Sequence, residues 1–398
     1  MNILEQIRKE HPWLETNKSY DLRRGKPSNE QLAFTQSIFE SLKIPFHADG
    51  IDLRNYGEPG GIPSARVLGS EILGTDPSET LALDNASLTL MHQIISCSYF
   101  FGFNSSNIDK ESKILCPAPG YDRHFKLIEN FGIEMITVPF QNDGPDLNFI
   151  ETALKQDKNI HGIVCVPRHS NPTGHTFSDN NVRSMFQMFS KFKKNFMILW
   201  DNAYACHDLT ETITQTNATI LAKEFDLQNN LFQFGSTSKI TLAGSGIAFL
   251  SSSEKNLEQF IDYRNGLAVG PNKMNQGLHV EYFKKLSIRN QMEKMKEILL
   301  PKFEIAKHYL SIIKENNLGN FTDPTGGYFL SYDSSKSNCD EIISICQKLN
   351  LKLLPAGSSF PYNKDPQNRN IRISPTFPSI DELEKSMKIL TSVVKHLN

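Results

Sequence analysis

Seven short apolar runs, rich in β-branched and aromatic residues, recur between about residues 80 and 265. They are TLAL, KILC, EMITV, HGIVCV, FMILW, LFQF and GIAFL. Segments with apolar residues at helical spacing, such as SLTLMHQIISCSYFF and NNVRSMFQMFSKFKK, separate most of them. Buried strands that alternate with helices are typical of βαβ units. The pattern predicts an α/β fold: a mostly parallel, seven-stranded sheet with helices on both faces.

The pattern changes in the last part of the chain. A long helical segment, QMEKMKEILLPKFEIAKHYLSIIKENN, is expected to be interrupted near Pro301. The run GGYFLSYD, a helix near CDEIISICQKLN, the run NIRISPTF and a helix from Asp381 follow it. This predicts a smaller α+β domain, which the first forty-odd residues are expected to join. We therefore expect a large domain at 46–285 and a small domain formed by 1–45 and 286–398.

Composition excludes several classes of partner. The formal net charge of -2 over 398 residues gives no electrostatic reason to expect nucleic acid or an anionic membrane surface. No segment approaches the roughly eighteen consecutive apolar residues of a membrane-spanning helix. The six cysteines lie in or beside apolar runs without a CxxC pair, so we expect buried free thiols and a cytoplasmic protein. The histidines show no metal-ligand spacing, and we expect no metal site.

Four of the predicted strands lead directly into clusters of polar residues. Ligand sites in open α/β sheets gather at the carboxyl ends of the strands, so we expect these clusters to lie together. Their residues are Asn85, Ala86 and Ser87 after LALD; Ser170, Asn171, Pro172, Thr173 and Gly174 after HGIVCVPRH; Asp201 and Tyr204 after FMILW; and Ser236, Thr237, Ser238 and Lys239 after LFQFG.

Each cluster alone also has a purely structural interpretation. Asn-Pro and Thr-Gly pairs form tight turns, and a lysine in a loop is ordinarily solvated. Asp201 and Ser87 are residue types that cap helix N-termini. Tyr121, which follows another predicted strand, would also fit in a core. The functional interpretation depends on the clusters acting together.

Together the clusters match what pyridoxal phosphate requires of a protein. Lys239 supplies an amine that can form a Schiff base with the cofactor aldehyde. Asp201 would keep the ring nitrogen protonated, while Asn171 and Tyr204 would hydrogen-bond the phenolate oxygen. Further cofactor contacts are expected from the phosphate cradle and from a ring-stacking residue. These are Asn85, Ala86, Ser87, Ser236 and Ser238 for the phosphate, and Tyr121 for the ring.

The motifs SNPTG, WDNAY and STSK, in this order, resemble those of the class I aminotransferases, which are fold type I pyridoxal phosphate enzymes. The segments DLRRGKPSNEQL, RNYGEPGGIPSAR, GPNKMNQ and NIRISPTFPSIDELEKSM are similar to the MocR-like, aspartate aminotransferase-like branch. The resemblance extends over nearly the whole chain. It does not include the DNA-binding domain that MocR-like regulators carry.

This resemblance implies further site residues. Arg372 is expected to bind the substrate α-carboxylate through its guanidinium fork. Gly25 would border the substrate, with Lys26 as a weaker contact. Tyr56 resembles the tyrosine that reaches the phosphate in the neighbouring subunit, which implies a homodimer with shared active sites. Without the resemblance, Arg372 would be interpreted as a solvated strand-edge arginine and Tyr56 as a turn residue.

Two departures from the family pattern affect ligand recognition. Gly246 stands where most members have a phosphate-binding arginine, and Leu278 replaces the arginine of an NQLRH motif. The phosphate must therefore be neutralised in another way, and Lys273 or Arg66 becomes a candidate for a distal substrate carboxylate.

The resemblance implies transamination between an L-amino acid and a 2-oxo acid. Aspartate or another acidic amino acid and 2-oxoglutarate are the default substrates of the branch. A lyase that performs β-elimination or C–S lysis on the same fold is the alternative, because both reactions use the same residues. A ligand-sensing module of a transcriptional regulator is a more remote alternative, and the segment before the first strand is not basic enough to suggest DNA binding.

Overall fold

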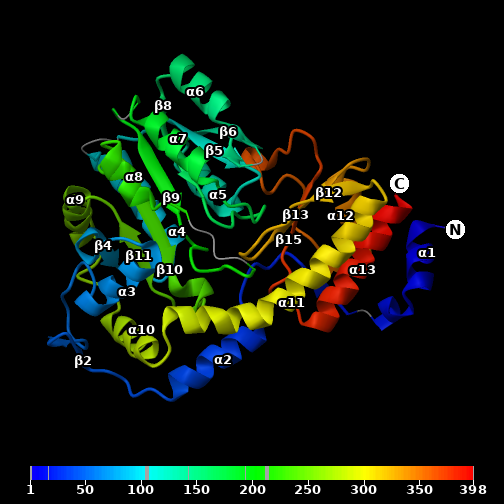
Figure 1. Cartoon of the computed structure of the whole chain (residues 1–398), viewed down its shortest axis with the longest axis horizontal. Helices are drawn as coiled ribbons and strands as arrows, with labels where there is room; N and C mark the ends of the chain where they lie inside the picture. Colours follow the sequence, from blue (N-terminus) through cyan, green and yellow to red (C-terminus); the bar gives the residue numbers. More distant parts are fainter. Residues whose placement is uncertain are drawn as a thin grey trace.

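The computed structural model describes residues 2–16, 18–103, 107–141, 143–192, 194–210 and 215–397. An eight-stranded sheet runs through the larger part of the molecule in the order β4-β11-β10-β9-β8-β5-β6-β7 (Figure 1). Its strands are β4 (Thr80–Ala82), β5 (Lys113–Ala118), β6 (Glu134–Gln141), β7 (Gly144–Pro145), β8 (Ile160–Cys165), β9 (Met197–Asp201), β10 (Leu231–Ser236) and β11 (Ala248–Ser251).

All seven strands expected from the apolar runs are present. The eighth, β7, is a two-residue strand that pairs antiparallel with the end of β6 at the sheet edge. The pairs β10–β9, β9–β8, β8–β5 and β5–β6 are parallel, whereas β11 is antiparallel to both of its neighbours. The sheet is therefore mostly parallel, and the carboxyl ends of its central strands meet at one edge.

Helices cover both faces of this sheet, as the alternating pattern predicted. The strand β9 shows why: Met197 and Leu199 pack on one face of the sheet against α4, α5 and α9, while Ile198 and Trp200 pack on the other face against α6, α7 and α8. Successive side chains of a strand point to opposite faces, so an apolar run has to be covered on both sides. These helices are α4 (Ser87–Phe101), α5 (Asp122–Asn130), α6 (Leu147–Gln156), α7 (Asp179–Phe189), α8 (Ala218–Glu224) and α9 (Glu254–Asn265).

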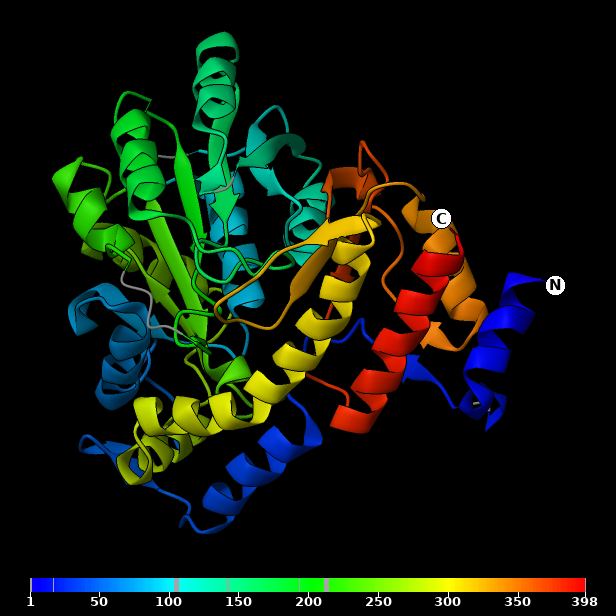
Figure 2. The same ribbon diagram turned by 45° about the vertical axis from the view of Figure 1, so that its right-hand side comes forward.

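A second hydrophobic core lies beside the sheet and draws on both ends of the chain. An antiparallel sheet of order β12-β13-β15 forms its centre, and β1 pairs in parallel with β14 (Figure 2). Its strands are β1 (Tyr20–Asp21), β12 (Gly319–Phe321), β13 (Leu330–Ser334), β14 (Leu351–Lys352) and β15 (Asn370–Ile373). Its helices are α1 (Ile3–Glu10), α11 (Ile288–Glu315), α12 (Cys339–Lys348) and α13 (Ile380–His396). This is the expected α+β unit; its boundary with the larger part, at 45 and 286, stays a prediction.

The expected interruption at Pro301 was wrong, because α11 continues through it. A proline inside a helix removes one backbone hydrogen bond and costs about 3 kcal/mol. Buried side chains on both sides of it, including Leu299, Phe303 and Ala306, pack into the second core and offset that cost. The carbonyl that loses its donor belongs to Glu297, which is exposed and can bind water.

Most of the remaining elements contribute to a further hydrophobic cluster, which includes Ala82 of β4 and Phe249 of β11. These remaining elements are α2 (Asn29–Glu40), the hairpin of β2 (His47–Ala48) and β3 (Ile51–Asp52), α3 (Pro63–Leu73) and α10 (Lys273–Lys285). Among the described residues, no helix has the length and apolar character needed to cross a bilayer. All six cysteines are free thiols, and five of them are buried.

Candidate active site

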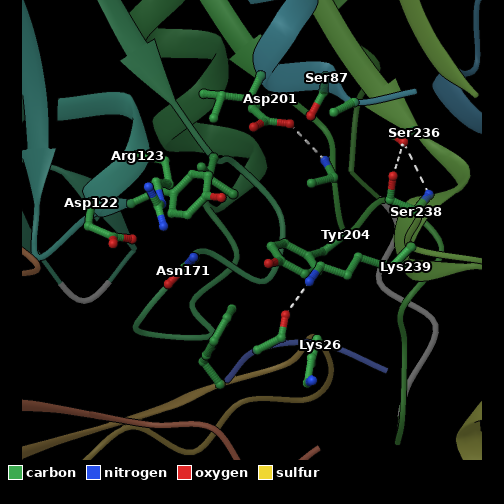
Figure 3. A pocket seen from close by; sticks show the side chains of 18 of the residues that line it. Lys26, Ser87, Asp122, Arg123, Asn171, Asp201, Tyr204, Ser236, Ser238 and Lys239 are labelled. Atoms are coloured by element: carbon green, nitrogen blue, oxygen red, sulfur yellow. Dashed lines mark hydrogen bonds between the residues drawn. The ribbon is translucent and has the colours of Figure 1, made fainter. Parts of the chain in front are cut away.

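A cavity of about 560 Å³ opens at the carboxyl ends of β8, β9 and β10, where the second core meets the large sheet (Figure 3). Residues from both parts of the molecule line it. Those that the sequence predicted are Gly25, Lys26, Ala86, Ser87, Tyr121, Asn171, Asp201, Tyr204, Ser236, Ser238, Lys239 and Arg372. The structure therefore brings the four polar clusters together in one place. Asn85 and Tyr56 are the predicted site residues outside this lining.

Lys239 extends into the cavity from the single 3₁₀ turn Thr237–Lys239 that follows β10. Its ammonium donates a hydrogen bond to the carbonyl of Gly25. Burial, assisted by the positive charge of Arg372, lowers the pKa of this ammonium to about 8. Lys239 is therefore not an ordinary loop lysine that is exposed to solvent. Its amine can act as a nucleophile or base near neutral pH.

The backbone of Lys239 is held from two sides. The hydroxyl of Tyr328 and Nε2 of His207 lie 3.3 and 3.2 Å from its carbonyl oxygen. Gln31 donates a hydrogen bond of 3.1 Å to the Tyr328 hydroxyl, and the Tyr328 ring centre lies 5.1 Å from the ammonium. Tyr328 and Gln31 belong to segments outside the large sheet, so they tie the lysine turn to the rest of the molecule.

Asp201 is the last residue of β9 and is 2% exposed. One carboxylate oxygen lies 2.9 Å from Nε2 of His124, and the other accepts a 3.1 Å hydrogen bond from the amide of Ala203. It caps no helix. His124 is also 2% exposed, so the contact between the imidazole and the carboxylate is buried. A buried carboxylate of this kind needs a positive or proton-bearing partner, which a protonated ring nitrogen in the cavity would supply.

The expected anion cradle forms where α4 begins. The N-cap of α4 is Ala86, which makes no side-chain capping bond, so the alternative of Ser87 as an ordinary cap is wrong. The hydroxyls of Ser236 and Ser238 lie 2.8 Å apart, and both donate to the backbone carbonyl of Asn85. Asn85 thus contributes by fixing the serines. The helix start and the Ser87 hydroxyl suit an anion such as phosphate, and the Ser236 and Ser238 hydroxyls could donate to it by turning away from the Asn85 carbonyl.

Gly246, which stands where the resemblance led us to expect an arginine, packs closely against this cradle. A Cβ at this position would lie 2.7 Å from the Ser238 hydroxyl oxygen and 3.1 Å from the Asn85 carbonyl. A side chain here would therefore require Ser238 to shift from its present position. Arg264, the buried arginine nearest in the sequence, is paired with Asp84 at 3.0 Å.

Arg372 lies on β15 and is 8% exposed, not solvated. Its guanidinium donates to the side-chain oxygen of Asn171 at 3.0 Å and to the carbonyl of Arg23 at 2.9 Å. Asp122 lies 3.5 Å away, and the ring centre of Phe329 4.7 Å away. Its Nε is buried and has no partner among the described residues. An unused donor on a buried guanidinium that lines a cavity is the arrangement that a carboxylate ligand requires.

The remaining predicted residues complete the lining. Burial raises the pKa of the Tyr204 phenol well above its usual value, so this hydroxyl remains a neutral donor. Tyr121 stands at the start of α5, edge-on to His124 with ring centres 4.8 Å apart. Gly25 lies so close to the Phe329 ring that a Cβ would collide with it. The ammonium of Lys26 lies over the Phe377 ring at 4.0 Å.

The residues around this cavity that sequence reasoning missed include His124, Arg123 and Tyr328. For His124 a signal existed, because it follows Tyr121 by three residues at a helix start, where both side chains share one face. Tyr328 carried no signal, since its contact with Lys239 spans 89 positions of sequence.

Of the candidates for a distal carboxylate, Arg66 donates to the carbonyls of Thr80 and Pro77. Lys273 donates to the carbonyls of Asp52 and Tyr56, and neither candidate lines this cavity.

The residues present fit pyridoxal phosphate. An amine of lowered pKa, a buried carboxylate, a serine-lined helix start and an arginine with an unused buried donor surround a single cavity. These groups match the aldehyde, the ring nitrogen and the phosphate of the cofactor and the carboxylate of an amino acid.

Comparison with known proteins gives the same result. The aspartate aminotransferase family model matches residues 6–397. An aspartate aminotransferase of Corynebacterium glutamicum is 38% identical over 383 residues, which cover 93% of this chain and 88% of that protein. A Mycolicibacterium smegmatis protein assigned as an aminotransferase is 39% identical over 381 residues, with coverage of 92% and 88%.

A solved structure from Corynebacterium diphtheriae, also assigned as an aminotransferase, superposes with a TM-score of 0.93 at 38% identity. The superposition covers 98% of both chains, so it includes the two cores and the cavity between them. The chain belongs to the aspartate aminotransferase family and is a pyridoxal phosphate-dependent aminotransferase.

Proposed function

We propose that the protein transfers an amino group between an acidic L-amino acid, aspartate in the first place, and a 2-oxo acid such as 2-oxoglutarate. The observation that carries this proposal is the charge of the cavity lining. Six cationic residues line it (Arg23, Arg24, Lys26, Arg123, Lys239 and Arg372), against the two carboxylates of Asp122 and Asp201. A positive lining favours substrates with more than one carboxylate. The name of the Corynebacterium glutamicum relative supports the same choice.

Lys239 has two tasks in this proposal. Its amine holds the cofactor aldehyde, and after release it carries the proton between the carbon atoms that exchange the amino group. A pKa of about 8 suits both tasks, because a useful fraction of the amine is neutral near pH 7. The bound cofactor supplies an electron-withdrawing ring that stabilises negative charge on the adjacent carbon.

The other residues position and polarise the reactants. Asp201, supported by His124, holds the proton on the ring nitrogen. Arg372 binds the substrate α-carboxylate. Because the side-chain oxygen of Asn171 accepts from Arg372, its NH₂ group is free to donate to the ring oxygen beside Tyr204. One residue thus links the substrate-binding arginine to the cofactor.

We also propose a cytoplasmic homodimer with shared active sites. Tyr56 is 83% exposed and lies outside the cavity of its own chain, which agrees with a role in the partner's phosphate site. The exposed apolar side chains Leu267 and Val269 would be covered by such a partner. The six free thiols agree with a reducing compartment.

A panel of amino acids added to the purified holoenzyme tests the proposed reaction. We expect aspartate and glutamate to convert the absorbance of the bound aldehyde cofactor stoichiometrically into that of its amine form, with release of one 2-oxo acid. Release of ammonia and pyruvate would instead indicate a lyase. An equal response to acidic and neutral amino acids would contradict the proposed substrate class.

A further inference from the structure

The arginine that follows Tyr121 and Asp122 has no role in the reaction described above. Arg123 is the second residue of α5, is exposed and lines the cavity. No carboxylate of the described residues forms an ion pair with it, although Asp122 and Arg372, its neighbours in the lining, pair with each other at 3.5 Å. It is therefore a free guanidinium at the mouth of a substrate cavity.

The position of Arg123 in its helix is electrostatically unfavourable. The N-terminal end of a helix carries partial positive charge, so a cation in the first turn is disfavoured. Its charge also acts on Arg372: burial lowers the pKa of the Arg372 guanidinium, Asp122 opposes this, and Arg123 lowers the pKa further. Two guanidiniums and a helix start thus repel one another around the same space. An anionic ligand between them would relieve this repulsion.

The remaining cations of the mouth are less available. Arg23 is bound to Asp21 through hydrogen bonds of 3.0 and 2.7 Å. Arg24 lies 3.9 Å from the same carboxylate and points mainly to solvent, with its side chain 61% exposed. Lys26 rests on an aromatic ring.

Arg123 also lies at the correct end of the cavity. In Figure 3 it stands beside Asn171 and Asp122, on the side opposite Ser236 and Ser238, with Tyr204 and Lys239 between the two sides. The serines form the phosphate side. Arg123 therefore faces the substrate, on the same side as the Asn171–Arg372 pair that would bind the α-carboxylate.

We propose that Arg123 binds the second carboxylate of a dicarboxylic substrate and so determines the preference for acidic amino acids. This inference rests on the proposed function. A four- or five-carbon dicarboxylate places one carboxylate on Arg372 and extends the other towards the free fork of Arg123. Arg123 then binds the distal carboxylate, and not Arg66 or Lys273, which the sequence suggested.

Binding of succinate, an unreactive dicarboxylate, to the holoenzyme tests this proposal by calorimetry. Arg123→Gln should weaken succinate binding by about ten- to one-hundred-fold, the range expected for a charge-assisted hydrogen bond. Lys126→Gln is the matched control: it removes one positive charge from the same helix, at a residue that pairs with Glu129 and does not line the cavity. This control should bind succinate as the wild type does. Arg123→Lys, which keeps the charge but not the fork, should give an intermediate value.

Kinetics add a second readout. In Arg123→Gln, kcat/KM for aspartate should fall by the same factor while kcat/KM for alanine stays unchanged, which also shows that the variant is folded. Unaltered succinate binding in Arg123→Gln, an equal loss in Lys126→Gln, or an equal loss for alanine would overturn the proposal. So would a wild-type enzyme that does not bind succinate. A wild type that binds succinate through Arg123 but transfers no amino group would contradict the proposed function alone.

Discussion

Two opposing effects act on the amine of Lys239. Burial and the charge of Arg372 destabilise its protonated form, whereas the carbonyl of Gly25 and the ring face of Tyr328 stabilise it. Burial is the larger effect, and the pKa of the amine falls to about 8. A lysine in water would remain protonated at this pH and would react slowly with an aldehyde.

The pH dependence of cofactor capture measures this balance. The neutral amine is the reactive form, so the capture rate of the cofactor-free protein should rise with pH and level off above about pH 8. Arg372→Ala removes one of the two causes of the lowered pKa and should shift the midpoint upward. N-acetyl-lysine in the same buffers corrects for titration of the cofactor itself. A rate that still rises between pH 9 and 10, as for that reference, would contradict the buried-amine account.

The residues that the sequence did predict share one property: they follow apolar runs at strand ends. Lys239, Asp201 and Asn171 could be found because parallel strands bring their carboxyl ends to one edge. The support of these residues could not be found in this way. The contact of Tyr328 with Lys239 depends on how the second core docks, and no local pattern encodes it.

At the scale of elements, β9 and α5 together fix the carboxylate of Asp201 in the cavity. The alternation of β9 puts its apolar residues into the hydrophobic clusters on the two faces of the large sheet and leaves Asp201 at the end of the strand. Helix α5 then presents His124 against this carboxylate, 77 positions away in sequence. Helix α5 therefore orients a carboxylate that belongs to a different element, the strand β9.

His124→Asn tests this support. Without the imidazole, Asp201 loses a buried hydrogen bond worth about 1.5–3 kcal/mol for a charged group, so we expect kcat to fall about ten-fold or more. The absorbance of the bound cofactor should shift, because the ring nitrogen is held less firmly. His92→Asn, on the neighbouring helix α4 and outside the cavity lining, is the control. Wild-type kcat and spectrum in His124→Asn would show that the pair is only structural.

Two of the differences between the predicted and the observed elements, at β7 and at α11, have physical explanations. β7 is two residues long and begins with glycine, so it has no apolar periodicity to detect. α11 passes through Pro301 because its buried face on both sides stabilises more than the proline costs. For β7, local propensity was uninformative. For α11, packing overrode the local propensity of Pro301.

At the scale of the whole molecule, the cavity exists only where the two cores meet. Lys239 and Asp201 come from the large sheet, whereas Arg372 and Gly25 come from segments packed with the second core. The amine of Lys239 and the guanidinium of Arg372 thus reach the cavity from different parts of the molecule.

Mixed dimers test whether the active sites are shared. Lys239→Ala and Tyr56→Phe chains with different tags are co-expressed, and the mixed species is purified. If Tyr56 serves the partner's phosphate site, one site of the mixed dimer has both Lys239 and Tyr56, so activity should exceed that of either parent. If Tyr56 acted within its own chain, both sites would be defective and no activity would return. A monomer in sedimentation experiments would contradict the proposal directly.

The central claim is that the amine of Lys239 holds the cofactor opposite Asp201, and borohydride reduction followed by peptide mass mapping tests it most directly. We predict that the reduced holoenzyme carries one pyridoxyl phosphate group per chain, on Lys239, and that Lys239→Ala carries none. A cofactor group on any other lysine, or equal labelling of Lys239→Ala, would contradict the account.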